Sequence, residues 1–274
     1  MTDIENGNGW SVTKGYADTP MGQVHYRQQG EGIPLLLLHQ TAWSSLQFSK
    51  AQPFLSERGV SSIALDTPGF GMSDGPSMPP GVEDYAEVIP AVMEHLGLER
   101  VCVCGHHTGA SIAAAFALEY PGMVDKLILH GAPLYDEERR KDRLSRPHFD
   151  QTPKEDGSHL TERWRIADNV VGSQATSEAI HWSVVQFFWA GPNEWFGHHA
   201  AFKFDLEPVI RVLVPPTLII SNTGDSLHAI AHQIMEMRPD FSYTELEGGT
   251  YHIIFENPES WAVAVTDYIK EREG

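Results

Sequence analysis

The sequence predicts a single α/β domain with a mostly parallel sheet, helices on both faces of that sheet and an inserted helical segment. Short apolar segments alternate with helical patterns along most of the 274 residues, as in βαβ architectures. An apolar strand pattern at 101–104 passes through glycines into an alanine-rich helical pattern, which is typical of a strand–turn–helix unit. An aromatic-rich region of about 134–210 then interrupts the alternation.

The first third of the chain predicts a hairpin followed by two buried strands. Trp10–Tyr16 and Val24–Gln28 alternate in polarity on either side of a Thr-Pro-Met-Gly turn, which favours a β-hairpin. Pro34–Leu38 is a continuous apolar run, as in a strand buried on both faces. Leu46–Arg58 has a helical pattern, and Ser61–Leu65 predicts the next strand.

The remaining elements continue the alternation. Val82–Leu98 predicts an amphipathic helix with a kink at Pro90. The central strand begins at Val101, and the helix after it covers Ser111–Tyr120. Further strands are predicted at Lys126–His130, Thr217–Ser221 and Phe241–Leu246, and further helices at Leu227–Met237 and Pro258–Glu271.

The turn Gly105-His106-His107-Thr108-Gly109 has the frame of a nucleophile elbow, whose usual form is G-x-S-x-G. The apex of such a turn is strained, with a positive φ that lifts its side chain above the sheet, and histidine tolerates positive φ better than most residues. The glycines allow strand and helix to approach closely, and the helix N-terminus directs partial positive charge at His107. We expect His106 to pack beneath the elbow.

Composition excludes several classes of partner. The formal net charge of −18 disfavours nucleic acid and anionic membranes, and no segment reaches the ~18 apolar residues of a membrane span. The acidic, polar start predicts no secretory signal, so a cytoplasmic location is expected. Cys102 and Cys104 lie two apart on one strand, which predicts buried, unpaired core thiols. A small-molecule substrate is expected, and a homodimer is left open.

The fourteen histidines do not predict a metal site or a cofactor site. The adjacent pairs His106-His107 and His198-His199 lack the i, i+4 spacing that places two ligands on one helix face. The chain has no H-E-x-x-H motif and no cysteine cluster. We therefore expect chemistry that uses neither a metal nor a cofactor.

The region 134–210, called the cap from here on, concentrates aromatic residues. It contains Trp164, Trp182, Phe187, Phe188, Trp189, Trp195 and Phe196. One interpretation is a lid over a binding pocket, and the alternative is that these rings form the core of the cap itself. The sequence leaves both open.

Taken together, the motifs make the chain resemble the α/β-hydrolase superfamily. The matching segments are LLLLHQTAWS at 35–44, LDTPGFGMSD at 65–74, GHHTGA at 105–110, the Gly-Asp pair at 224–225 and GGTYH at 248–252. The resemblance implies a mostly parallel eight-stranded sheet with a helical cap after the sixth strand. It divides the chain into a core segment 1–133, the cap 134–210 and a second core segment 211–274.

The resemblance also assigns site residues. His107 occupies the nucleophile position, Asp225 the acid position and His252 the catalytic histidine position, in the chain order that the superfamily uses. The backbone N–H groups of Thr41 and Thr108 would form the oxyanion hole. Substrate-lining side chains are predicted at His39, Gln40, Trp43, Trp182, Trp189 and Tyr251, and Gln40 replaces the glycine that is usual in the family.

The leading functional hypothesis is hydrolysis of a small, fairly apolar ester or lactone. Asp225 would accept the Nδ1–H of His252 and orient it as general acid and base. His107 would act as nucleophile, as the base that activates water, or only as a wall of the pocket. One alternative is a lyase or cofactor-independent oxygenase that uses only the His252–Asp225 dyad. Another is a non-catalytic, hydrolase-like ligand receptor.

Overall fold

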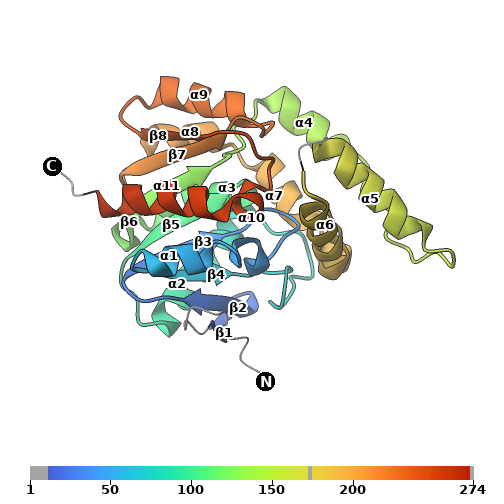
Figure 1. Ribbon diagram of the computed structural model, residues 1–274, viewed down its shortest axis with the longest axis horizontal. Helices are drawn as coiled ribbons and strands as arrows, with labels where there is room; N and C mark the ends of the chain where they lie inside the picture. Colours follow the sequence, from blue (N-terminus) through green and yellow to red (C-terminus); the bar gives the residue numbers. More distant parts are fainter. Residues whose placement is uncertain (1–11, 172–174, 272–274) are drawn as a thin grey trace.

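The structure, a computed structural model, describes residues 12–171 and 175–271 and contains one eight-stranded sheet (Figure 1). The strand order is β1-β2-β4-β3-β5-β6-β7-β8, and all neighbours from β4 to β8 in this order pair in parallel. The strands are β1 Thr13–Thr19, β2 Gly22–Gln29, β3 Ile33–Leu38, β4 Val60–Leu65, β5 Val101–His106, β6 Val124–His130, β7 Thr217–Asn222 and β8 Ser242–Leu246. This confirms the predicted fold class.

The predicted hairpin forms, with β1 and β2 antiparallel and Thr19 opposite Gly22. Trp10, at the start of the first predicted strand, lies outside the described residues.

Two helical layers cover the sheet, and the alternation of side chains along the strands explains why both faces are buried. On β3, Leu36 and Leu38 pack with one cluster, which includes residues of α2 (Val82–His95), α3 (Thr108–Glu119) and α9 (His228–Met237). Leu35 and Leu37 pack with the opposite cluster, with residues of α1 (Gln52–Glu57), α10 (Ile253–Glu256) and α11 (Pro258–Lys270). Cys102 and Cys104 are unpaired and buried in this second cluster, as predicted.

Helices occupy the chain between β6 and β7. They include α4 Glu137–Ser145, α5 Ser158–Val171, α6 Ser177–Ala190, α7 Phe196–Lys203 and α8 Leu206–Val212. Figure 1 shows α4, α5 and α6 together at one side of the sheet. The bounds 134–210 for a separate cap remain a prediction. None of the described helices is long and apolar enough to cross a membrane.

Several predicted helices differ in extent from the observed ones, and the one predicted at Val82–Leu98 ends at His95. The helix expected over Leu46–Arg58 divides into a 3₁₀ turn at Ser45–Phe48 and α1. Pro53 in the first turn of α1 explains the break, because its missing N–H is tolerated at a helix start but would leave a carbonyl unpaired in one continuous helix. The helix after the elbow begins at Thr108, three residues earlier than predicted.

Candidate active site

The elbow has the strained geometry that the frame predicts. His107 has φ 50° and ψ −112°, and it is the single non-glycine residue with positive φ in the part of the chain that the structure describes. An added Cβ at Gly105 would collide with the backbone of Gly109, and one at Gly109 would collide with the Leu38 carbonyl. The two glycines therefore allow α3 to start directly against β3 and β5, with His107 at the carboxyl edge of the sheet.

Asp225 pairs with His107, which corrects the predicted pairing of Asp225 with His252. The Nε2 of His107 donates to Oδ2 of Asp225 at 2.6 Å, and the Leu227 N–H donates to Oδ1 at 2.8 Å. Burial raises the pKa of Asp225, but the nearby His107 charge and these hydrogen bonds outweigh burial and bring the pKa to about 2. Asp225 is a carboxylate and accepts a hydrogen bond from Nε2–H. The basic nitrogen of neutral His107 is therefore Nδ1.

Gly131 makes the His107–Asp225 contact possible. It follows β6 with φ +58°, and an added Cβ would lie 2.5 Å from Cδ2 and 2.7 Å from Nε2 of His107. The same Cβ would lie 3.4 Å from Oδ2 of Asp225. The imidazole therefore rests on bare backbone. The sequence analysis missed this residue, since a glycine after a strand has no signal that distinguishes it from an ordinary turn.

His252 has a different role in the hydrogen-bond network from the one predicted. Its Nδ1 lies 3.4 Å from Nε2 of Gln40, which also donates to the Tyr251 carbonyl at 3.1 Å. The two amide hydrogens of Gln40 thus hold His252 with Nδ1 as acceptor and Nε2 as donor. That Nε2 is buried and has no hydrogen-bond partner among the described residues. Burial and the neighbouring His107 lower the pKa of His252 to about 3, so it is neutral at physiological pH.

A second glutamine connects the loop after β3 with the elbow. Oε1 of Gln47 accepts the Gln40 N–H at 3.0 Å, and its Nε2 lies 2.6 Å from Nδ1 of His106. His106 is fully buried beneath the elbow, as predicted, and burial followed by three nearby histidines lowers its pKa. Because Gln47 donates to Nδ1, the proton of neutral His106 sits on Nε2, which has no partner among the described residues.

A further buried histidine, His130, also contacts the elbow. Trp261 Nε1 donates to His130 Nδ1 at 3.2 Å, so His130 Nε2 carries the proton and donates to Asn222 Oδ1 at 3.2 Å. Burial lowers the pKa of His130 to about 4. The His130 carbonyl accepts the His107 N–H at 2.9 Å. The sequence analysis missed this network because its residues come from four distant segments.

The two predicted oxyanion-hole donors carry no hydrogen bond to any residue of the described ranges. Thr108 is the first residue of α3, where a backbone N–H has no partner inside the helix. Thr41 lies in the loop after β3, and Gly197 of α7 approaches its side chain so closely that a Cβ there would collide with Thr41 Oγ1. Both N–H groups are therefore free to donate, and that of Thr108 directly follows the His107 apex.

The predicted substrate-lining residues divide into two groups. Both ring nitrogens of His39 are used within the protein, with Nδ1 2.8 Å from the Gln40 carbonyl and Nε2 3.0 Å from the Thr67 N–H. Trp189 is 63 % exposed and donates to the Gly71 carbonyl at 2.7 Å. These contacts hold the two side chains against neighbouring loops, and a substrate-lining role for them stays a prediction. Tyr251 remains close to the site, since its ring centroid lies 6.3 Å from that of His107.

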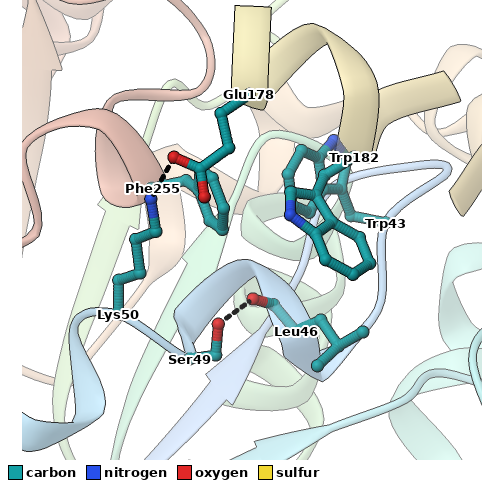
Figure 2. Close-up of a pocket in the computed structure, with 7 residues that line it drawn as sticks. All are labelled: Trp43, Leu46, Ser49, Lys50, Glu178, Trp182 and Phe255. Carbon is teal, nitrogen blue, oxygen red and sulfur yellow. Dashed lines mark hydrogen bonds and ion pairs between the residues drawn. The ribbon is translucent and has the colours of Figure 1, made fainter. Parts of the chain in front are cut away.

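A pocket of about 220 Å³ lies next to Trp43, and Figure 2 shows the residues that line it. It is lined by Trp43, Leu46, Ser49, Lys50, Glu178, Trp182 and Phe255. The Trp43 ring centroid lies 5.3 Å from that of His252 and 5.5 Å from that of Phe255. Trp43 therefore contacts both the pocket and His252, and the Lys50–Glu178 ion pair at 2.8 Å borders the pocket.

Among the described residues, two groups of side chains have the spacing of metal ligands. His106, His107 and Asp225 form one, but Asp225 already holds the Nε2 proton of His107 and Gln47 occupies Nδ1 of His106. The other is His228, His232 and Glu245, on α9 and β8. The hydrogen bonds of the first group fit an acid–base pair better than a set of open ligands.

The cap contributes a residue that the motifs did not reveal. His198 of α7 is accessible to solvent, yet desolvation lowers its pKa to about 4, with further lowering by the charges of His107, Arg163 and Arg143. The contribution of His107 to this shift indicates that α7 lies near the elbow, as does the contact between Gly197 and the Thr41 side chain.

The chain is similar to known hydrolases in sequence. The chain is 32% identical to a 2-hydroxy-6-oxo-6-phenylhexa-2,4-dienoate hydrolase of Comamonas testosteroni over 139 residues, about half of each protein. It is 24% identical over 260 residues to a 2-(acetamidomethylene)succinate hydrolase of Mesorhizobium japonicum, covering 90% of this chain and 91% of that protein.

Among solved structures, the enol-lactonase from Burkholderia xenovorans LB400 superposes with a TM-score of 0.77 at 19% identity, over 94% of this chain and all of that one. At that identity the likeness concerns the fold. The family described as alpha/beta hydrolase fold matches residues 33–258, so the chain belongs to the alpha/beta hydrolase family.

Proposed function

We propose that the protein is a hydrolase in which the His107–Asp225 pair activates a water molecule to attack an ester or lactone carbonyl. The observation that carries this proposal is the 2.6 Å contact between His107 Nε2 and Asp225 Oδ2. A carboxylate on one imidazole nitrogen stabilises the imidazolium and makes the other nitrogen a better base. The apex of the elbow, where relatives carry a nucleophile, then holds a general base.

The steps follow from the positions of the groups. Nδ1 of His107 takes a proton from water as the water oxygen attacks the carbonyl carbon. The resulting oxyanion accepts hydrogen bonds from the N–H of Thr41 and from the N–H of Thr108, the first residue of α3. Collapse breaks the carbon–oxygen bond, and the leaving alkoxide takes the proton back from Nδ1. This route needs no acyl-enzyme intermediate.

His252 serves as a hydrogen-bond donor in this proposal. Gln40 fixes its Nε2–H tautomer, and the low pKa of about 3 keeps the ring neutral, so Nε2 donates without adding charge. A buried donor without a protein partner is stabilised when a substrate oxygen accepts from it. Gln40 stands where the family usually has glycine. It thus supports a site in which His252 donates a hydrogen bond to the substrate and His107 accepts a proton from water.

The relatives support hydrolysis of a carbonyl compound. Their printed names include a succinate-derivative hydrolase, a dienoate hydrolase and an enol-lactonase. An activated ester or enol lactone is therefore the appropriate first substrate.

The test measures acid release from 4-nitrophenyl esters and enol lactones in a pH-stat. His107→Ala and Asp225→Asn should each reduce kcat roughly 10²- to 10⁴-fold, the usual range for removing a general base or its orientation. The surface variant His181→Ala should match the native protein. Intact-protein mass spectrometry during turnover should show no acyl adduct. Near-native kcat in His107→Ala, or an adduct on His107, would exclude water activation by His107.

A further inference from the structure

Two histidines and a glutamate converge where α9 lies against the edge of the sheet. His228 and His232 are one turn apart on α9, at the i, i+4 spacing that places two imidazoles on one side of a helix. Glu245 comes from β8, the last strand in the sheet order. One nitrogen of each histidine and one oxygen of Glu245 all lie within 4.8 Å of one another. The sequence analysis weighed only adjacent histidine pairs and therefore missed this one.

The sheet directs two hydroxyl groups at this cluster. Ser221 of β7 is the register partner of Glu245 in the parallel ladder, so their side chains lie on the same face of the sheet. Tyr243 precedes Glu245 by two residues and shares that face, because side chains alternate along a strand. The hydroxyls of Ser221 and Tyr243 lie 2.8 Å apart, beside the glutamate.

A chain of hydrogen bonds fixes the tautomer of neutral His228. The Tyr243 hydroxyl donates its one proton to Oε2 of Glu245 at 2.9 Å. The Ser221 hydroxyl must then donate to the Tyr243 oxygen. Ser221 Oγ also lies 3.1 Å from Nδ1 of His228, and because its proton is already used, it accepts the Nδ1–H. Nε2 of His228 is therefore left with a lone pair.

The separations within the cluster suit a metal ion better than direct hydrogen bonds. Nε2 of His228 lies 3.5 Å from Oε2 of Glu245, and Nε2 of His232 lies 3.9 Å from the same oxygen. Both distances exceed the roughly 2.7–3.2 Å of an N–H···O hydrogen bond. Ligand atoms around a tetrahedral Zn²⁺, with bonds of about 2.0–2.2 Å, lie about 3.3–3.6 Å apart. A cation between the three atoms would also remove the repulsion between the His228 lone pair and the carboxylate.

We propose that His228, His232 and Glu245 bind one Zn²⁺ ion, with water as the fourth ligand, and that the ion fixes α9 to the edge strand β8. Two imidazoles and a carboxylate are a donor set that zinc favours, whereas Mg²⁺ and Ca²⁺ prefer oxygen ligands. Ser221 and Tyr243 are the outer partners that such a site needs, since they orient one histidine and the carboxylate.

The zinc site is separate from the proposed chemistry. His228 begins α9 three residues after Asp225, whose carboxylate contacts His107. The ion would hold the helix that follows Asp225, but its ligands include none of the groups that act in the proposed reaction. The inference therefore does not depend on the hydrolase proposal. The net charge of −18 favours the approach of a cation.

The test measures Zn²⁺ binding to chelator-treated protein by titration calorimetry and by Tm. One equivalent should bind, and zinc at a hundredfold excess over Kd should raise the Tm by roughly 5 °C or more, whereas Mg²⁺ should not. His232→Ala and Glu245→Gln should each weaken zinc binding at least ~10-fold. These two side chains are 53% and 42% exposed, so both variants should fold. His181→Ala, at an exposed position of α6, is the matched control and should bind zinc like the native protein.

A variant behind the ligands distinguishes a built site from a pair of surface histidines. Ser221→Ala keeps all three ligands but removes the acceptor of the His228 Nδ1–H. Zinc affinity should therefore fall roughly 10- to 100-fold, as is usual when a ligating histidine loses its outer hydrogen bond. Unchanged affinity in Ser221→Ala would contradict the site as described.

His107→Ala separates this site from the other group with ligand spacing, formed by His106, His107 and Asp225. Zinc bound at the elbow would be lost in that variant, whereas zinc at α9 should be retained. The proposal is refuted if zinc produces neither heat nor a Tm shift, or if His232→Ala and Glu245→Gln bind it as tightly as the native protein. Binding that is weakened in those two variants and kept in His107→Ala and His181→Ala supports it.

Discussion

Replacing Gly131 with alanine should disable the site by displacing one side chain. The new Cβ would lie 2.5–2.7 Å from the His107 ring, so the imidazole must move away from Asp225. We expect kcat to fall roughly 10²- to 10⁴-fold, as when a catalytic histidine loses its orienting carboxylate. The positive φ of +58° adds a stability cost of about 1–2 kcal/mol, or a few degrees in Tm.

Gly97→Ala is the control that isolates the backbone cost. Gly97 ends α2 with φ +66°, close to that of Gly131, and an added Cβ there meets nothing within 4 Å. Both variants should therefore lose a similar few degrees of Tm in calorimetry, but only Gly131→Ala should lose ester turnover. If the two variants retain equal activity, the His107–Asp225 contact does not control the chemistry.

Three further predictions concern other groups. His107→Ser combined with Gln40→Gly should react covalently with organophosphates. His107→Ser alone should react less, because Gln40 holds His252 in the Nε2–H tautomer, which cannot accept the serine proton at Nε2. Equal labelling of the native protein would contradict this prediction. His130 and His252 have pKa values of about 4 and 3 in the folded protein, so between pH 7 and 5 only the unfolded chain gains their protons. Each should therefore lower the free energy of unfolding by ~2 kcal/mol when the pH falls from 7 to 5. Equal urea midpoints at both pH values would refute this. Burial raises the pKa of Cys102 to about 11, so iodoacetamide should leave it unmodified until the protein unfolds.

The fold was predictable because its signals are local. The apolar run at Pro34–Leu38, the glycines of the elbow and the alternation of strands with helices each reflect a constraint that acts within about twenty residues. The strained apex at His107 was also predictable, since the Gly-x-x-x-Gly frame has few other conformations. Where the Pro53 signal was overlooked, a single helix was predicted in place of two short ones.

The pairing within the site was not predictable. Motif order identified Asp225, His252 and His107, but the distance that selects a partner for Asp225 depends on Gly131, which lies 94 residues before it. The tautomer of His252 depends on Gln40, 212 residues earlier in the chain.

Gln47 gives the site a mechanical property that a static description of its hydrogen bonds does not express. Its single amide holds the backbone at Gln40 with its oxygen and the ring of His106 with its nitrogen. One side chain therefore links the loop bearing Thr41 to the turn bearing Thr108, although 67 residues separate the two threonines along the chain. The distance between the N–H groups of Thr41 and Thr108 thus depends on the length of the Gln47 side chain. Shortening it to asparagine would uncouple them without touching either.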